Sequence, residues 1–361
     1  MKTLLVATGR GGHLIPAMAL AEHLRTYGPC RILCTARPAE RTMVDSSSIE
    51  WTTVDLQRLT PMWRWFLPWY TLRQLKAVLR IWTVMRQMRP QVVVGFGGYL
   101  SAVGVAAARV TGLPTVVHEQ NLLPGRANRL LARLADAVAV TFSETKQFLP
   151  HRAAIEITGN PIRTSFKRVS LEEARSAFGL DLTRPVLLVM GGSQGARAVN
   201  TLCVEMWRGR TAEIRQQVQI IHLAGAAQAK EVEKAYQAFG MEARVFDFLH
   251  AIHLAMAAAT LAVSRAGASS IAEMVSLQLP VLLIPYPYAG GHQRANAQWM
   301  QKTGGAVVLE EKGLTAQRLW MQLGSLLWAP ERISNMRAAL AAQANGSAVE
   351  RLGSLVRKVA R

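Results

Sequence analysis

The sequence predicts an α/β protein made of two similar domains with parallel sheets that face each other across a cleft. Two observations lead to this prediction. Short apolar runs alternate with helical patterns along the 361 residues, as in sheets whose parallel strands are joined by crossover helices. A glycine-rich segment also follows a predicted strand twice, at Thr8–His13 and at Gly191–Arg197. Strand, glycine loop and helix together aim backbone N–H groups at a phosphate, which indicates a phosphorylated substrate.

The first half carries five clear strand signals, each a short apolar run bounded by turn residues. These runs are Thr3–Ala7, Arg31–Thr35, Val92–Gly95, Thr115–His118 and Ala137–Val140. A helix over Ile15–Arg25 is expected after the first strand, because apolar residues recur there at helical spacing. The pattern pauses near Gly159-Asn160-Pro161, so the first domain is expected to cover residues 1–160.

The second half repeats the alternation and is expected to form a domain over residues 161–344. Its predicted strands are Val186–Met190, Gln219–Ala224, Arg244–Phe246, Leu261–Ser264, Val281–Ile284 and Ala306–Leu309. A helix over Ala198–Trp207 is expected directly after the second glycine loop. The last helix, within 345–361, is expected to pack back on the first domain.

Composition restricts the class of protein. Half of the residues are apolar, which indicates a globular chain rather than a disordered one. The three cysteines, Cys30, Cys34 and Cys203, are too few for a disulfide framework and suit small buried positions. The chain opens on a predicted strand, so we expect no signal peptide and a reducing, cytoplasmic setting.

The net charge of +19 is consistent with three kinds of anionic partner: a nucleic acid, an anionic membrane or an anionic substrate. No acidic residue lies between Asp55 and Glu119, and an aromatic stretch, Met62–Tyr70, opens that gap. The gap contains these basic residues: Arg58, Arg64, Arg73, Lys76, Arg80, Arg86, Arg89 and Arg109. Such a density of charge excludes a transmembrane helix.

A helix is expected in this basic stretch, with apolar residues on one face and cations on another. Leu72, Leu75, Leu79 and Trp82 recur at helical spacing. We interpret the stretch as an interfacial membrane helix that meets an anionic lipid surface. The residues expected at the membrane are Trp65, Trp69, Arg73, Leu75 and Lys76. The alternative is a helix packed on the core with a solvated basic face.

The first glycine loop is not a dinucleotide fingerprint. Leu14 occupies the position that G-x-G-x-x-G would require after Gly9, and no acidic residue ends the second predicted strand to bind a ribose. Hydride transfer is therefore not expected. His13 ends the loop at a helix N-terminus, where it either faces a cleft or serves the loop structurally.

Three further polar clusters follow predicted strands, at the edge where ligands bind in α/β sheets. They are His118–Asn121, Arg265–Glu273 and Gly291–Asn296. Each could also be structural: a buried polar network, ordinary helix N-terminal chemistry or a surface loop. The chain has no Asp-x-Asp, no zinc-ligand spacing and no Walker lysine, so neither a metal nor a cofactor is expected. Helix termini, hydroxyls and cations would then stabilise a departing diphosphate.

Taken together, these motifs resemble the MurG-type enzymes of glycosyltransferase family 28. The resemblance rests on Gly11–His13, Gly97–Tyr99, His118–Asn121, Thr158–Arg163, Gly191–Arg197, Arg265–Glu273 and His292-Gln293, in that order along nearly the whole chain. It implies a GT-B fold of two Rossmann-like domains and an inverting transfer of GlcNAc from UDP-GlcNAc to lipid I, giving lipid II. It also implies a peripheral position on the cytoplasmic side of the cell membrane and cell-wall or division proteins as partners.

The resemblance also implies roles for particular residues. The donor UDP-GlcNAc would meet Gly11, Gly12, Asn121, Arg163, Ser193, Phe248, Leu249, Ala268, Ser269, Ser270, Glu273 and Gln293. The lipid acceptor would meet Arg10, His13, Tyr99 and Asn121. The family usually has Gly-Gly-Thr-Gly-Gly-His in the first loop, whereas Thr8 and Arg10 replace its first glycine and its threonine here.

Two residues are candidates for the base that takes the proton from the acceptor hydroxyl: His13 and Glu119. We favour His13, because histidine titrates near neutral pH and this one ends a loop that a substrate can approach. Two other functions fit parts of the sequence. A UDP-GlcNAc 2-epimerase would share the fold but not need the basic aromatic stretch. A nucleic-acid-binding protein would use the charge but not the paired glycine loops.

Overall fold

The computed structural model describes residues 1–9, 11–35, 37–45, 47–56, 67–150, 154–167, 169–192, 195–288, 290–344 and 346–360. The chain divides into two compact units. The first is Met1–Arg163 together with Ser347–Arg361, and the second is Thr164–Gly346. The sequence predicts these joints at 160 and 344.

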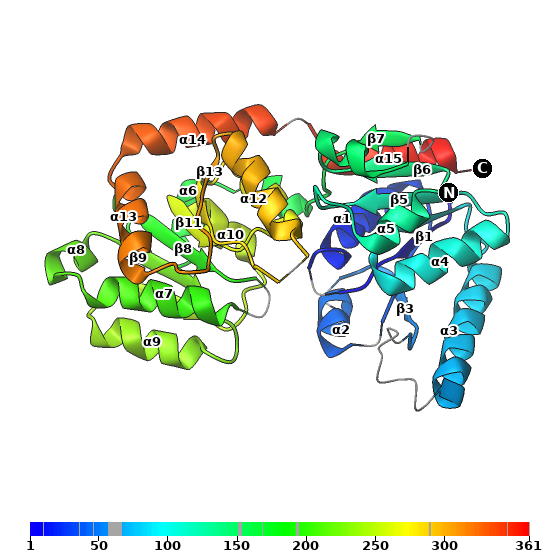
Figure 1. Cartoon of the computed structure of the whole chain (residues 1–361), viewed down its shortest axis with the longest axis horizontal. Coiled ribbons are helices and arrows are strands. Elements are labelled where there is room, and N and C mark those ends of the chain that lie inside the picture. Colours follow the sequence, from blue (N-terminus) through cyan, green and yellow to red (C-terminus); the bar gives the residue numbers. More distant parts are fainter. Residues whose placement is uncertain are drawn as a thin grey trace. The chain divides into compact units, whose positions relative to one another are not determined.

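The first unit contains a seven-stranded parallel sheet with the order β3-β2-β1-β4-β5-β6-β7 (Figure 1). Its strands are β1 (Thr3–Val6), β2 (Cys30–Cys34), β3 (Glu50–Thr53), β4 (Val92–Gly95), β5 (Thr115–Glu119), β6 (Ala137–Val140) and β7 (Ile155–Ile157). The five predicted strands are confirmed. The two edge strands, β3 and β7, are not among the predicted ones, because neither has a continuous apolar run.

Helices cover both faces of this sheet, as parallel sheets require. Successive residues of β1 point to opposite faces: Leu5 packs with α1 (Leu14–Leu24) and α15 (Ala348–Val359), whereas Leu4 packs with α3 (Leu67–Met88) and α4 (Gly98–Val110). The remaining helical segments are η1 (Arg25–Tyr27), α2 (Pro38–Asp45), α5 (Arg126–Leu131) and η3 (Ser143–Phe148). The last helix of the chain thus completes the core of the first unit.

The second unit contains a six-stranded parallel sheet with the order β10-β9-β8-β11-β12-β13. Its strands are β8 (Val186–Met190), β9 (Gln219–Leu223), β10 (Ala243–Phe246), β11 (Leu261–Ser264), β12 (Val281–Leu283) and β13 (Ala306–Val308). All six correspond to predicted strands. Its helical segments are η4 (Thr164–Lys167), α6 (Leu171–Ser176), α7 (Arg197–Arg208), α8 (Ala212–Gln216), α9 (Ala229–Ala238), α10 (Ile252–Ala258), α11 (Ala268–Ser276), α12 (His292–Lys302), α13 (Ala316–Leu327) and α14 (Pro330–Gln343).

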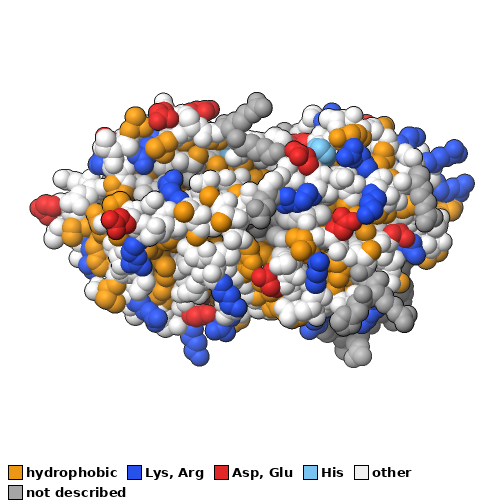
Figure 2. All heavy atoms as spheres, turned by 90° about the horizontal axis from the view of Figure 1, so that it is seen from above, with side chains coloured by type: hydrophobic (Ala, Val, Ile, Leu, Met, Phe, Trp, Pro, Cys, Tyr) orange, Lys and Arg blue, Asp and Glu red, His pale blue; other side chains and the backbone are white. Residues whose placement is uncertain are grey.

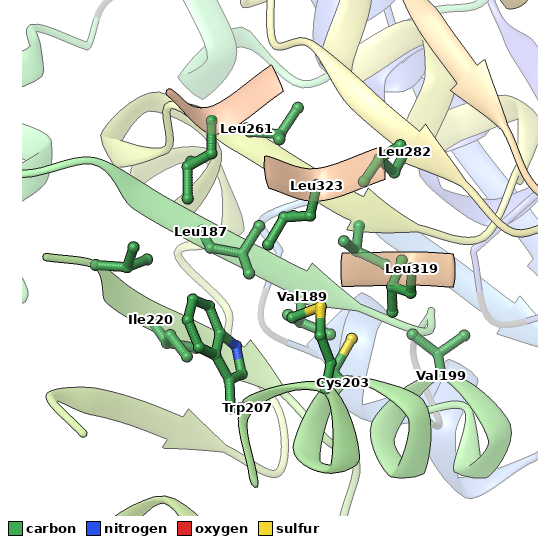
Figure 3. Close-up of a cluster of buried hydrophobic side chains, with 14 of the residues drawn as sticks. Leu187, Val189, Val199, Cys203, Trp207, Ile220, Leu261, Leu282, Leu319 and Leu323 are labelled. Atoms are coloured by element: carbon green, nitrogen blue, oxygen red, sulfur yellow. The ribbon is translucent and has the colours of Figure 1, made fainter. Parts of the chain in front are cut away.

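The largest apolar cluster of the second unit lies between β8 and helices α7, α9 and α13. In Figure 3, Cys203 and Trp207 of α7 point at Leu187 and Val189 of β8. Cys203 and Trp207 are fully buried, which confirms a small buried role for this cysteine. The cluster anchors α7, so the helix that follows the second glycine loop cannot easily shift.

Candidate functional site

Both sheets place their motif loops at the point where strand order reverses. In the first sheet β1 and β4 are neighbours: β2 and β3 lie on the β1 side of this pair, and β5, β6 and β7 lie on the β4 side. In the second sheet β8 and β11 are neighbours in the same way. Ligands of open α/β sheets bind in the crevice outside the carboxyl ends of such strands. The loops that follow these four strands contain Gly11–His13, Gly97–Tyr99, Gly191–Arg197 and Arg265–Glu273. Each unit therefore carries its motifs at the edge where a ligand is expected.

In the first unit, the loop after β1 is held by a carboxylate that the sequence did not single out. Gly9 has φ +96° and donates its N–H to Glu40 Oε1 at 2.7 Å. Glu40 is fully buried, and its other oxygen accepts hydrogen bonds from the N–H and the hydroxyl of Thr35. The N–H of Gly9 is thus used inside the protein and is not available to a ligand. Arg10 lies outside the described residues.

Two glycines let the loop after β4 approach the loop after β1. Gly97 and Gly98 both have left-handed backbone angles, with φ +99° and +81°. A Cβ on Gly97 would lie 3.0 Å from His13 Cε1, and one on Gly98 would lie 2.7 Å from Thr8 Oγ1. Glycine is needed here both for the backbone angle and for the space. The next residue, Tyr99, is half-buried against the α3–α4 cluster.

His13 is the N-cap residue of α1 and is bound to the polar residues that follow β5. Its Nδ1 lies 3.0 Å from Gln120 Oε1. Gln120 Nε2 lies 3.1 Å from His118 Nδ1, and His118 Nε2 lies 2.9 Å from the carbonyl oxygen of Gly159. Burial lowers the pKa of His118 to about 4, so its ring is neutral at pH 7.

The carboxylate of Glu119 is fully occupied by N–H groups of its own loop. Oε1 accepts from the backbone and side-chain N–H groups of Asn121, at 2.9 and 3.2 Å. Oε2 accepts from Gly125 N at 3.0 Å and from Asn128 Nδ2 at 2.8 Å. A carboxylate offers about four lone-pair positions, and all four are used here. Glu119, 1% exposed, shapes the loop that carries Asn121.

In the second unit, the glycine loop after β8 packs tightly against the end of β9. Gly195 has φ +74°, and a Cβ there would lie only 2.0 Å from the carbonyl oxygen of Ala224. Helix α7 follows, and the side chain of its N-cap residue, Ala196, makes no hydrogen bond to the first turn. The N-cap residue thus leaves the first-turn N–H groups of α7 without a cap from its own side chain, an arrangement that suits anion binding. Ser193 lies outside the described residues.

The loop after β11 leads into α11, whose N-cap residue Gly267 likewise supplies no side-chain cap. Ala268, Ser269 and Ser270 form the first turn of α11, and Glu273 lies on its second turn. Ser269 and Glu273 are buried, with exposed fractions of 7% and 4%. Helices α7 and α11, whose N-cap residues supply no side-chain cap, thus follow the adjacent central strands β8 and β11.

Gln293 joins the loops that follow β11 and β12. Its Oε1 accepts from Ala266 N at 3.2 Å and from Tyr286 N at 2.9 Å. Arg265 reinforces this junction, because it donates to the carbonyl oxygen of Ile284 and lies over the Tyr286 ring. The oxygen of the Gln293 amide is used within the protein, so the nitrogen end is the one suited to a ligand.

The residues expected at the uracil lie in different units. Phe248 and Leu249 follow β10, and the exposed Phe248 ring makes an edge contact with His250 at 4.9 Å between centroids. Arg163 is the last residue of the first unit.

Helix α3 has two apolar faces, and one of them is exposed. Ala77, Ile81, Val84 and Met85 are buried against the first sheet. The opposite face exposes these apolar side chains to between 39% and 55%: Leu72, Leu75, Val78, Leu79 and Trp82. We call these five residues the α3 patch.

Cations accompany the α3 patch. Arg73, Lys76 and Arg80 are exposed beside it, and Arg86 lies over the Trp82 ring. Trp69 lies on the first turn of α3, and Trp65 lies outside the described residues. Elsewhere, on the face drawn in Figure 2, Lys and Arg side chains are dispersed among acidic and apolar ones. Within the described ranges, no helix combines the length and the apolarity needed to cross a bilayer.

The chain is similar to known proteins in both sequence and fold. The models of the glycosyltransferase family 28 N-terminal and C-terminal domains match residues 3–140 and 186–352. A UDP-N-acetylglucosamine–N-acetylmuramyl-(pentapeptide) pyrophosphoryl-undecaprenol N-acetylglucosamine transferase of Desulforudis audaxviator (strain MP104C) is 34% identical over 100% of this chain and 99% of its own. A relative of the same name from Moorella thermoacetica (strain ATCC 39073 / JCM 9320) is 32% identical, with 99% of each chain covered.

Solved structures agree with the sequence relatives. The crystal structure of Acinetobacter baumannii MurG matches with a TM-score of 0.75 and 25% identity, covering 99% of each chain. A putative UDP-N-acetylglucosamine 2-epimerase from Listeria monocytogenes matches with a TM-score of 0.72 but only 14% identity, a likeness of fold alone. The chain therefore has the GT-B fold and belongs to glycosyltransferase family 28, among the UDP-N-acetylglucosamine–N-acetylmuramyl-(pentapeptide) pyrophosphoryl-undecaprenol N-acetylglucosamine transferases.

Proposed function

We propose that this chain transfers GlcNAc from UDP-GlcNAc to the C4 hydroxyl of MurNAc in lipid I, with inversion, and so forms lipid II. The observation that carries the proposal is full-length similarity to relatives named for this transfer. The site is consistent with it, because a histidine and two helix N-termini whose N-cap residues supply no side-chain cap are groups that glycosyl transfer from a nucleotide can use.

His13 is the base in this proposal. In the transfer, the oxygen of the C4 hydroxyl forms a bond to C1 of GlcNAc, the C1–O bond to UDP breaks, and the hydroxyl proton passes to His13. Two features of the first unit favour His13 over Glu119. The His13 ring lies against Gly97 at the edge of the central strands, and Glu119 has no lone pair left for a substrate proton.

The second unit holds the donor in this proposal. The negative charge that develops on the departing UDP would be stabilised at the N-termini of α7 and α11, with the Ser269 and Ser270 hydroxyls nearby. Glu273 would accept hydrogen bonds from the ribose diol, and Phe248 with Leu249 and Arg163 would meet the uracil. Gln293 and Asn121 would contact the GlcNAc, alongside Gly11 and Gly12.

The first unit holds the acceptor and meets the membrane in this proposal. Tyr99, Asn121 and Arg10 would line the acceptor side near His13. The α3 patch would enter the lipid interface of an anionic cytoplasmic leaflet, with Arg73 and Lys76 close to lipid headgroups. This location would bring the enzyme to a lipid-linked substrate and near cell-wall and division proteins.

A direct assay tests the reaction. The purified chain is incubated with UDP-GlcNAc, with and without a lipid I analogue, and both UDP and the disaccharide product are measured. We expect UDP release that depends on the acceptor and matches the disaccharide one to one. Release of UDP together with a 2-epimerised sugar in the absence of acceptor would replace the proposal with the epimerase.

A further inference from the structure

The amide of Gln120 has only one orientation that its surroundings allow. Its Nε2 lies 3.0 Å from the carbonyl oxygen of Phe96 and 3.2 Å from that of His118. Carbonyl oxygens only accept hydrogen bonds, so this end of the amide must be the NH₂ group. The Gln120 oxygen therefore faces His13, and Gln120 is fully buried, which prevents water from replacing either contact.

The orientation of Gln120 determines which nitrogen of His13 carries the proton. Gln120 Oε1 only accepts, so His13 Nδ1, 3.0 Å away, must be the N–H donor. In the neutral ring the lone pair then belongs to Nε2. The base would act through Nε2, and the other tautomer would present an N–H to the hydroxyl from which the proton must come.

His118 anchors the other end of the chain of hydrogen bonds. Its Nε2 lies 2.9 Å from the Gly159 carbonyl oxygen, so Nε2 carries the proton and Nδ1 accepts from Gln120 Nε2. A protonated His118 would place an N–H against the NH₂ of Gln120 and would oppose the orientation just described. Burial, which lowers the pKa of His118 to about 4, keeps the ring neutral.

From these contacts we propose that Gln120, anchored by His118, is a positioning residue that holds His13 in the Nδ1–H tautomer and so leaves Nε2 as the base. The role in turnover rests on the proposed function, whereas the tautomer is a property of the free protein. The buried amide of Gln120 thus orients the His13 ring in addition to packing within the loop that follows β5.

The test compares Gln120→Met with Gln120→Glu. Methionine has a similar shape but offers no oxygen to His13, whereas glutamate keeps an oxygen at the same reach and, as the neutral acid that burial favours, an O–H for the carbonyl oxygen of Phe96. Ring-nitrogen chemical shifts of ¹⁵N-histidine protein, with the His13 signals assigned through His13→Asn, report the tautomer directly. Turnover with a lipid I analogue is measured alongside, and melting curves with methyl spectra report whether each variant is folded.

We expect Nδ1–H in the parent protein, a mixture or the Nε2–H form in Gln120→Met, and Nδ1–H again in Gln120→Glu. Turnover should fall about 10²-fold or more in Gln120→Met, within the range associated with loss of a general base, and recover in part in Gln120→Glu. If Gln120→Met does not fold, Gln120→Asn replaces it, because the shorter amide cannot reach His13.

Two results would overturn the inference: an Nε2–H tautomer in the parent protein, or an unchanged Nδ1–H signal when the Gln120 oxygen is removed. A changed tautomer with unchanged turnover would support the positioning contact but remove His13 as the base. A parent protein that makes no disaccharide would count against the proposed function and leave the tautomer result valid.

Discussion

His13 is the residue on which the proposed chemistry depends most. It lies at the N-terminus of α1, its ring contacts Gly97, and its Nδ1 is bound by Gln120. We predict that His13→Ala reduces turnover about 10²–10⁴-fold, because general-base catalysis contributes about that much. The affinity for UDP, measured by calorimetry, should stay close to that of the parent protein.

His13→Asn separates proton transfer from hydrogen bonding at the same position. Asparagine keeps a donor for a phosphate but cannot take the proton. If His13→Asn retains most of the turnover, His13 acts only as a phosphate contact and the base must be sought elsewhere.

Glu273 tests donor recognition at a single residue. It is 4% exposed on the second turn of α11, next to the first-turn hydroxyls of Ser269 and Ser270. We predict that Glu273→Ala weakens UDP binding about tenfold or more, because a hydrogen bond to a charged group contributes about 1.5–3 kcal/mol. The matched control is Glu310→Ala, which removes an exposed carboxylate from the same unit. Equal UDP affinities for the two variants would remove Glu273 from the donor site.

Helix α3 offers a test at the scale of one element. We predict that Leu75→Ser and Leu79→Ser, combined with Arg73→Gln and Lys76→Gln, reduce binding to anionic vesicles at least tenfold. Each cation near an anionic surface contributes about 1 kcal/mol, and burial of each leucine contributes more. Turnover on a short-chain soluble acceptor should be unchanged, because these side chains face away from the buried side of α3.

The control for this experiment is the double variant Met321→Ser and Arg318→Gln on α13, where Met321 is 54% exposed, similar to Leu75 at 55%. It should co-sediment with the vesicles as the parent protein does. A parent protein that does not bind anionic vesicles would make the α3 patch an interface of another kind.

The buried histidines predict how stability depends on pH. Burial lowers the pKa of His118 to about 4 and that of His222 to about 3, whereas both titrate near pH 6.5 in an unfolded chain. As the pH falls below 6.5, the unfolded chain binds protons that the folded one does not. The contribution of each histidine to folded stability should therefore be complete above pH 6.5 and fall by up to about 1.4 kcal/mol per pH unit below it. The decline ends at the folded pKa, about 4 for His118 and about 3 for His222.

His222 is the residue to replace in this test, because it lies far along the chain from His13 in the second unit. It is bound by Tyr236 and Asn200, and glutamine can make similar hydrogen bonds without titrating. Unfolding in urea, monitored by hydrogen exchange of β9, gives the free energy of unfolding of the second unit. Between pH 6.5 and 4 this free energy should decline less steeply in His222→Gln than in the parent protein. If the free energy of unfolding depends on pH with the same slope in both proteins, His222 does not have a lowered pKa in the folded state.

The elements that the sequence predicts well are those with a strong local signal. Central strands such as β1 and β8 are continuous apolar runs, and α1 and α7 lie within one residue of their predicted bounds. The strands β3 and β7 could not be found in this way, because an edge strand such as Glu50–Thr53 is half-exposed and has no apolar run. Pairing with a neighbour, rather than composition, makes it a strand.

Prediction from local sequence patterns has the same limit at the candidate site. Motifs locate His13 and Glu119, but they do not show which groups these side chains bind: His13 pairs with Gln120, which is distant in sequence, and Glu119 pairs with N–H groups between Asn121 and Asn128. The orientation of Gln120 depends on carbonyl groups of Phe96 and His118 that no side-chain pattern reveals. Glu40 accepts hydrogen bonds from Gly9 and Thr35, but the sequence shows only an acidic residue in the first turn of a helix and does not predict these contacts.

For the whole molecule, hydrogen exchange can test whether the second unit binds the donor and the first unit binds the acceptor. We predict that UDP alone slows exchange in the second unit, in the loops that follow β8, β10 and β11. At 100 times its dissociation constant a ligand stabilises the state that binds it by about 2.7 kcal/mol, which would slow exchange through unfolding about 100-fold there. Loops of the first unit, at Gly97–Tyr99 and Gln120–Asn128, should be unaffected by UDP.

UDP-GlcNAc and a lipid I analogue complete the comparison. The additional sugar of UDP-GlcNAc should add protection around Asn121 and Gly11, because those residues are assigned to GlcNAc and not to UDP. The acceptor analogue alone should protect Gly97–Tyr99 in the first unit. Protection of that segment by UDP, with none after β8 or β11, would reverse the assignment of donor and acceptor. Both units have the same switch-point architecture, so the side chains of those loops, rather than the fold, decide which ligand each unit binds.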